Sequence, residues 1–377
     1  SLPQGFAIVV LAHAYVNLAV VVRIVGSQWA QHDGRYLHAA RSLGASRLTA
    51  FRTITLPFLR PSIISSAVVV FIFSFTSLGI IVLLGDASTR TLESQILRRT
   101  SVLLDFPTAA ALAVLQLALI SVVIAIGAAA SRQRGRQKPV RAALLALPRD
   151  LGTRLTIRVI AAVGCAIVLL PVLALLLASL RSQAGFTVQW WASLGSVDAG
   201  TTRIGSPIAS LAQSIRFALM TGVVAGIIGG CAAIAVLAHR WGRLVTLFAI
   251  IPLGISAATL GLGMLLAFGR PPLDLRATGL LIPLAHSLVA IPLVVAVMAP
   301  ALRGIDPRVQ QVAATLGARP TRAFFTAYGP TLRIAMIAAG GLACAVSLGE
   351  FGAASFLART GAPTVPIQIV RLISRPG

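Results

Sequence analysis

The chain has 377 residues, of which 57% are hydrophobic and only 11% are charged, and its formal net charge is +23. Soluble globular domains carry about a quarter charged residues, so this composition excludes an ordinary soluble domain. Apolar runs longer than the roughly 18 residues that suggest a membrane span recur along the chain. Because backbone groups in lipid must bond within their own segment, the sequence predicts an all-α, polytopic transmembrane helical bundle.

Eight spans are predicted, and in chain order they cover 5–26, 61–84, 107–130, 157–180, 211–236, 244–268, 278–302 and 331–357. The connections between them alternate between a basic set with twenty Lys or Arg and a set with ten. The basic connections are 27–60, 131–158, 237–243 and 303–333. Since Lys- and Arg-rich short loops stay in the cytoplasm, this set is predicted to be cytoplasmic, and the other connections, 85–106, 181–210, 269–277 and 358–377, are predicted to be external. The charge therefore indicates topology in a lipid bilayer, and we expect no nucleic acid as a partner.

The first connection contains the stretch "HAARSLGASRLTAFRTITLP" at 38–57, which is basic and amphipathic. Steps of 3, 4, 4 and 3 residues, typical of one helix face, separate Leu37, Ala40, Gly44, Leu48 and Phe51. A glycine inside such a pattern costs about 1 kcal/mol against alanine, so Gly44 indicates a bend or a close contact with a partner. Pro57 and Pro61 are predicted to end this segment before the next span.

A second copy of this region lies 273 residues further along the chain. The sequence "LAH" occurs at 11–13 and 284–286, and "LGA" occurs at 43–45 and 316–318. The copies are six predicted spans apart, which is an even number, so both cross the membrane in the same direction. The sequence therefore predicts two parallel-repeat halves around a pathway.

The halves are predicted at 1–135 and 157–377, joined by a cytoplasmic Arg-rich linker at 136–156. When one half is mapped onto the other, three spans are missing before the first copy and one after the second. We therefore expect a piece of a longer protein, trimmed at both ends, with about eight of twelve spans present.

The first loop resembles the cytoplasmic loop of ATP-binding-cassette (ABC) importer permeases, which reads E-A-A, three residues, G, nine residues, I-x-L-P. The matching positions are His38-Ala39-Ala40, Gly44 and Ile54-x-Leu56-Pro57. The second copy is weaker and keeps Ala313, Gly317 and Pro330. In the family this loop forms a coupling helix that docks on the ATPase subunit. The resemblance therefore implies ATPase-coupling helices at about 36–50 and 309–323.

Both copies lack the acid of the family motif, which His38 and Gln311 replace. Because the first copy keeps more of the motif, we expect it to dock more typically than the second. Taken alone, the first stretch would also suit an interfacial helix on anionic lipid.

Two such loops in one polypeptide resemble the fused two-half permeases of the iron(III) and thiamine importer group. The stretch "SLGEFGAASFL" at 347–357 is similar to a recurring element of that group. The resemblance implies import of iron(III) or thiamine across the bacterial cytoplasmic (inner) membrane by alternating access. It also implies two ATPase subunits and an extracytoplasmic substrate-binding protein as partners.

Four residues are candidates for the substrate path. Glu350 is the one acid predicted inside a span, where an ionisable group marks a functional site by default, although it could instead pair with an arginine. Its mate in the first copy is Ser77. His13 and His286 hold matching places in the two copies and could flank the path or bridge helices by hydrogen bonds.

The sequence also predicts what this chain does not do. A phosphate-binding loop of the type G-x-x-x-x-G-K-[ST] is absent, because the one lysine, Lys138, is followed by Pro139. Its cysteines and histidines form no cluster with metal-ligand spacing. We therefore expect no enzyme, no metal and no cofactor in this chain, with ATP bound by partner subunits. The alternative is a secondary transporter with parallel repeats, which would need ion-coupling residues within the membrane.

Overall fold

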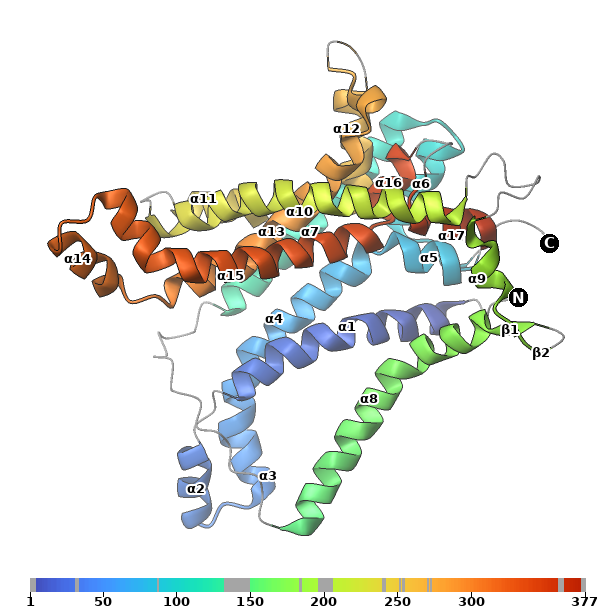
Figure 1. The fold of residues 1–377 in the computed structure, drawn as a ribbon. Helices are drawn as coiled ribbons and strands as arrows, with labels where there is room; N and C mark the ends of the chain where they lie inside the picture. The colour runs from blue at the N-terminus through green and yellow to red at the C-terminus, as the bar shows by residue number, and fades with distance from the viewer. Residues whose placement is uncertain are drawn as a thin grey trace. The chain divides into compact units, whose positions relative to one another are not determined.

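The computed structural model describes residues 5–30, 34–86, 88–131, 150–182, 185–195, 206–238, 242–250, 252, 255–269, 271, 273–358 and 363–373, and all structural statements refer to these residues. They are helical apart from turns and one short antiparallel strand pair (Figure 1). The elements are α1 (Phe6–Trp29), α2 (Gly34–Ser42), α3 (Arg47–Ala50), η1 (Phe51–Thr55), α4 (Leu56–Phe75), α5 (Leu78–Leu84), α6 (Leu92–Ser101), α7 (Phe106–Ser131), α8 (Leu151–Ser179), β1 (Arg181–Ser182), β2 (Gly185–Phe186), α9 (Gln189–Ala192), η2 (Ser193–Gly195), α10 (Pro207–Ala238), α11 (Gly242–Ile250), α12 (Ala257–Phe268), η4 (Leu275–Thr278), α13 (Leu281–Arg303), α14 (Pro307–Thr315), α15 (Pro320–Gly349), α16 (Gly352–Leu357) and α17 (Val365–Ile373).

The predicted all-α, polytopic class is confirmed, with seven helical segments long and apolar enough to cross a membrane. They are Phe6–Trp29, Arg47–Phe75, Phe106–Gly127, Leu151–Ser179, Pro207–Leu237, Leu281–Arg303 and Pro320–Gly349. The prediction of an eighth span at 244–268 is wrong, because α11 and α12 divide that run. Pro252, which has no backbone N–H, follows α11, and the hydroxyl of Ser256 caps α12. With 12 residues, α12 is about 18 Å long, well short of a bilayer core of about 30 Å.

The proline residues of the first loop do not end its helix. Helical backbone runs from Arg47 through α3, η1 and α4 to Phe75, so the prediction that Pro57 and Pro61 end the segment is wrong. Pro57 cannot donate to the carbonyl four residues earlier, and the π-helical turn η1 directly before it changes the hydrogen-bond register there. The loop is therefore continuous with the span.

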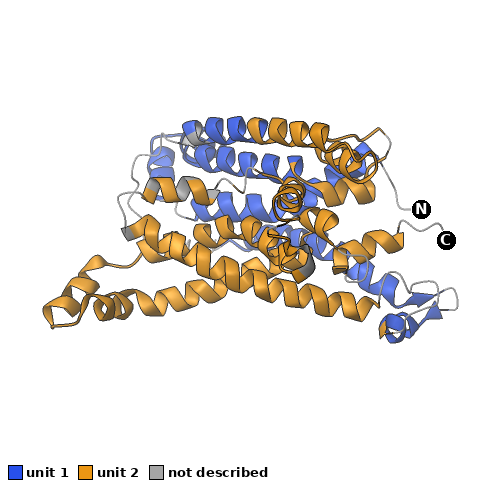
Figure 2. Cartoon of the chain, turned by 90° about the horizontal axis from the view of Figure 1, so that it is seen from above, with its two compact units in different colours: residues 1–75, 119–194 blue, residues 76–118, 195–377 orange. Residues whose placement is uncertain are grey.

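The chain divides into two compact units, which Figure 2 distinguishes by colour. Unit 1 comprises Ser1–Phe75 and Leu119–Leu194. Within it α1 packs along α4, and the Nδ2 atom of Asn17 donates to the hydroxyl of Ser74 at 3.4 Å. Helix α8 is apolar but has no buried residue, so its surface is available to lipid or to a partner chain.

Unit 2 comprises Thr76–Ala118 and Gly195–Gly377, and its centre is the packing of α10, α13 and α15, which run side by side (Figure 1). Small residues allow close approach of the backbones. A Cβ atom on Gly222 would lie 2.5 Å from Sγ of Cys344 and 3.2 Å from the carbonyl oxygen of Gly340. Such small-residue contacts are typical of helix packing in membranes. The buried residues include Ala225, Ala233, Ala290, Val294, Met298, Ala339 and Ala343.

A second cluster of unit 2 joins α6, the first half of α7, α12 and α16. Ile96, Ala109, Ala113 and Leu262 are buried together, and Phe106 and Phe356 pack against them. Segments from both predicted halves contribute to each compact unit, and residues 136–149 of the predicted linker lie outside the described residues. The division into halves at 1–135 and 157–377 stays a prediction about sequence duplication.

Candidate functional site

The first loop folds as two helices joined by a tight turn at Gly44. The N–H of Gly44 donates to the carbonyl of Arg41 at 3.0 Å, and the N–H of Ala45 donates to the carbonyl of Ala40 at 3.0 Å. This pair of bonds is a Schellman turn, which needs a left-handed residue, and Gly44 has a φ of +85°. The bend that the sequence predicted at this glycine is therefore present.

The second loop has the same backbone geometry. The N–H of Gly317 donates to the carbonyl of Ala314 at 3.0 Å, that of Ala318 donates to the carbonyl of Ala313 at 3.1 Å, and the φ of Gly317 is +83°. Helices α2 and α14 each have nine residues, and both begin and end at positions 273 residues apart. Asp306 caps α14, since its Oδ1 atom accepts from the N–H of Arg308 at 2.9 Å.

Both loops expose apolar side chains beside the glycine. Leu43 is 87% exposed, and its counterpart Leu316 is 83% exposed. Neither α2 nor α14 contains a buried residue, so these helices are not held by a core of their own. These exposed leucines are therefore accessible to another protein.

The first loop also encloses a hollow of about 340 Å³ within unit 1. Trp29 and Phe51 form part of its wall, with ring centroids 6.3 Å apart, and Arg41 and Arg47 are at its edge. Of the other predicted coupling residues, Ala39 is exposed on α2, and Leu56 and Pro57 are exposed in the first turn of α4. In the second loop Pro330 is exposed inside α15.

Ser77 and Glu350 both lie at helix breaks. Ser77 stands between α4 and α5 with φ −84° and ψ 102°, and Glu350 stands between α15 and α16 with φ −77° and ψ 115°. These breaks divide the predicted spans 61–84 and 331–357. Both residues belong to unit 2, where Phe351 lies against Gly79 of α5. Exposed backbone groups at a break inside a membrane protein are tolerated where they line a cavity or are buried in protein.

The two candidate histidines make different contacts. Nδ1 of His286 lies 2.8 Å from the hydroxyl of Ser347, whose Oγ donates to Thr221 at 3.2 Å, so His286 links α13 with α15 and α10. Nδ1 of His13 lies 2.8 Å from the carbonyl of Val9 on its own helix. The Nε2 atoms of both histidines are buried and have no hydrogen-bond partner within the described ranges.

Sequence reasoning missed Glu93, which it placed in an external connection. This side chain is fully buried in unit 2, where Nε2 of Gln116 donates to its Oε1 atom at 2.6 Å. A signal was present, because Glu93 shares one face of α6 with the buried residues Ile96 and Thr100, at spacings of three and four. An acid on the apolar face of an amphipathic helix indicates a buried partner.

Burial raises the pKa of Glu93 to about 7, and the nearby charge of Glu350 also raises it. Hydrogen bonds from Gln116 and Ser256 oppose this rise. Helix α6 lies between the spans, and burial makes ionisation of this carboxyl group costly near neutral pH.

Comparison with known proteins supports the resemblance of this chain to ABC importer permeases, which the two loops suggested. The model of the family "Binding-protein-dependent transport system inner membrane component" matches residues 2–137. A probable ABC transporter permease protein of Sinorhizobium fredii is 24% identical over 98% of this chain and 68% of its own length. These matches support an inner-membrane permease of the binding-protein-dependent ABC class.

Two further relatives match about half of the permease. A Salmonella paratyphi A protein named for 2-aminoethylphosphonate transport is 27% identical over 55% of this chain and 78% of its own length. The putrescine transport system permease of Escherichia coli is 28% identical over 56% of this chain and 77% of its own length.

Similarity to this class favours an ABC transport subunit over the secondary-transporter alternative, and subunits of this class are not themselves enzymes. It also implies an ATPase and a binding protein as partners. No cofactor is expected in a subunit of this class.

Proposed function

We propose that this permease couples ATP-driven closure of two ATPase subunits to alternating access through the loops at about 36–50 and 309–323. The observation that carries the proposal is the pair of loops with one backbone geometry, each with an exposed leucine before a left-handed glycine. Each loop would dock on one ATPase subunit at the cytoplasmic side. The binding protein would deliver substrate at the opposite side.

Continuity of the helices supports the transmission of force. The first loop enters the continuous helical segment Arg47–Phe75, and the second enters α15 at Pro320. A docked loop therefore cannot move without its span, since a helix is stiff along its axis. Each of these spans ends at a break, at Ser77 or Glu350, where its orientation can change relative to the next helix.

We infer that the two loops belong to two halves of one fused chain. The equal offsets of α2 and α14 support this inference, as do the breaks at Ser77 and Glu350, which are also 273 residues apart. The relatives that match over about three quarters of their own length use only about half of this chain. The prediction that each half has six spans is also part of this proposal.

The substrate belongs to the same proposal. The sequence resemblance suggests iron(III) or thiamine, and relatives are named for putrescine and for 2-aminoethylphosphonate. Uptake by proteoliposomes that contain the permease, its ATPase and its binding protein identifies the cargo, when the four compounds are compared in radiolabelled form.

Docking is tested by Leu43→Asp and Leu316→Asp, with Leu273→Asp as a matched control. Leu273 is 57% exposed and lies in a connection predicted to be external. Burial of an apolar anchor at an interface is worth more than about 1 kcal/mol, so each loop variant should weaken ATPase association by about tenfold. The ratio of ATPase to permease after co-purification measures this. Equal association in all three variants would overturn the proposal.

A further inference from the structure

A buried polar cluster lies in unit 2 where α6, α7, α12 and the break after α15 meet. Its members are Glu93, Gln116, Ser256 and Glu350. The exposed fraction is 0% for Glu93 and 1% each for Gln116 and Ser256. Glu350, at the break, shares this neighbourhood, since its charge acts on Glu93.

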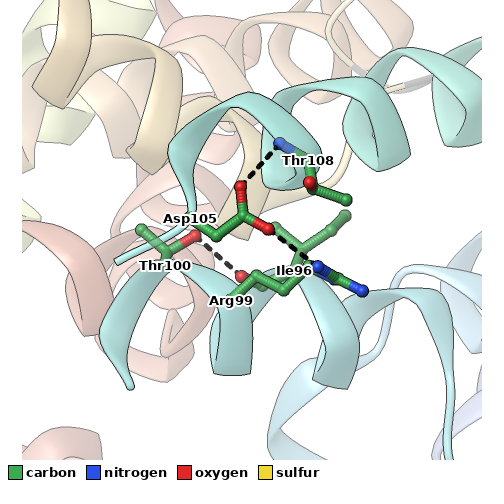
Figure 3. A network of polar contacts seen from close by, with 5 residues as sticks. All are labelled: Ile96, Arg99, Thr100, Asp105 and Thr108. Carbon is green, nitrogen blue, oxygen red and sulfur yellow. Dashed lines mark hydrogen bonds and ion pairs between the residues drawn. The ribbon is translucent and has the colours of Figure 1, made fainter. Parts of the chain in front are cut away.

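The position of Glu93 is fixed at both ends of α6. A reciprocal capping box joins Thr91 and Ser94 at its start. After its end, Asp105 binds NH1 of Arg99 at 2.8 Å and accepts from the N–H of Thr108 in α7 at 3.2 Å (Figure 3). The hydrogen bond from Thr108 holds the pKa of Asp105 below its usual value, so this contact stays charged. The α6–α7 corner therefore holds Glu93 against Gln116.

The cluster offers more acceptors than it has donors. Oε2 of Glu93 and Oε1 of Gln116 are buried and have no hydrogen-bond partner among the described residues. Oε1 of Glu350 accepts from the N–H of Ala353 at 3.3 Å, and the hydroxyl of Ser256, which lies 2.9 Å from that of Thr259, is the second donor beside Glu93. The ion pair found in the described part of the chain joins Arg99 and Asp105, so neither Glu93 nor Glu350 is paired with a cation there. A buried carboxyl group is stabilised either by protonation or by a cation, and a cationic donor could satisfy the free oxygens of Glu93 and Gln116 together.

An apolar groove of about 350 Å³ lies within unit 2, and its lining residues neighbour Gln116 and Ser256 without including any member of the cluster. Ala113 and Leu117, which flank Gln116 on α7, form one side of it, and Thr259, the partner of Ser256, lies on the α12 side. Sites for small molecules are mostly apolar with a few placed polar groups, and their volumes begin at about 300 Å³. The groove can hold an alkyl body while the cluster holds a charged end.

We propose that Glu93, Gln116 and Glu350 form a site for the ammonium group of a substrate whose apolar part lies in the adjoining groove. An ammonium group has three N–H donors, which suits the free oxygens of Glu93 and Gln116 together with the Glu350 carboxylate. The inference rests on the proposed function, because it makes the cluster a binding site on the substrate path of the permease. It assigns an amine as the substrate class.

Binding is tested at neutral pH on the permease in nanodiscs, to which its ATPase subunits are added. The probe is butylammonium chloride, with 1-butanol as its neutral isostere and sodium chloride at equal ionic strength. The midpoint of thermal unfolding should rise saturably with butylammonium alone. Glu93→Gln and Glu350→Gln, which keep side-chain volume, should raise the half-saturating concentration about tenfold or more. The exposed helix cap variant Asp150→Asn should leave it unchanged.

The proposal is overturned if butylammonium does not shift the midpoint, if butanol or sodium matches it, or if the glutamate variants bind it as the parent does. Association with the ATPase is scored on the same samples. A complex that associates without binding the probe overturns the ammonium site alone. A permease that binds the probe but never associates with an ATPase overturns the proposed function alone.

Discussion

Gly44 and Gly317 have φ values of +85° and +83°, in the left-handed region that side chains disfavour. No atom lies within 4 Å of a Cβ built on either residue, so space is not the constraint there. The constraint is conformational, because a residue with a Cβ pays roughly 1–2 kcal/mol in this region. The glycines are therefore required by the turn that presents Leu43 and Leu316.

We expect Gly44→Val to weaken ATPase association more than Gly44→Asn. Asparagine tolerates the left-handed conformation, whereas a β-branched side chain opposes it and would open the Schellman turn. Co-purification of the ATPase with each variant measures the effect. Equal association for valine and asparagine would show that the turn geometry is unimportant for docking.

Glu93 should make stability depend on pH. Its pKa is about 7 in the folded permease against 4.5 as a free side chain, so the folded state holds more protons between these values. The free energy of unfolding therefore falls as pH rises through this window. Glu93→Gln should remove this contribution. The thermal midpoint of Glu93→Gln minus that of the parent, followed from about pH 3.5 to about pH 8 (about one unit beyond each value), should increase with pH. A constant difference would contradict the burial of this carboxyl group.

At the scale of elements, the spans are organised by breaks and by close packing. Three predicted runs are divided, at Ser77, at Glu350 and between α11 and α12. Elsewhere glycine and alanine residues let α10, α13 and α15 approach closely. The breaks give freedom to the ends of the helices, and the small residues keep the centre of unit 2 rigid.

Gly222→Leu should destabilise this packing by about 1–3 kcal/mol, the usual cost of overpacking. Even a Cβ would meet Sγ of Cys344 and the backbone of Gly340. Gly164→Leu is the matched control, since Gly164 of α8 has no atom within 4 Å of such a Cβ. Thermal midpoints of the purified variants measure the difference. A loss at Gly164 as large as that at Gly222 would contradict the assignment of the core.

At the scale of the whole molecule, charge and hydropathy determine topology. The basic connections include both loops with left-handed glycines, which places both on the cytoplasmic side by the positive-inside rule. Helix α8, apolar and without buried residues, has a surface suited to lipid. Transport then needs partners on both faces of the membrane.

Cysteine labelling should report this topology. In a background with Cys165, Cys231 and Cys344 replaced by alanine, Leu43→Cys and Leu316→Cys should react with an impermeant maleimide only in inverted vesicles. Leu273→Cys should react only in intact cells, because 269–277 is a predicted external connection. Labelling of Leu316→Cys from outside would exclude the second coupling loop.

The sequence alone determined the class of protein and the places of the two loops. Membrane spans follow from local composition, and a turn that needs a glycine follows from its motif, so both can be read along the chain. The sequence also predicted an uninterrupted span at 244–268 and a helix end at Pro57, and both predictions are wrong. Local composition distinguishes neither a helix break in the first case nor a π-helical turn in the second. Only the tertiary structure brought Glu93, Gln116 and Glu350 together. Glu93 and Glu350, which interact electrostatically, are 257 positions apart (350 minus 93), and no local pattern specifies which helices meet across that distance.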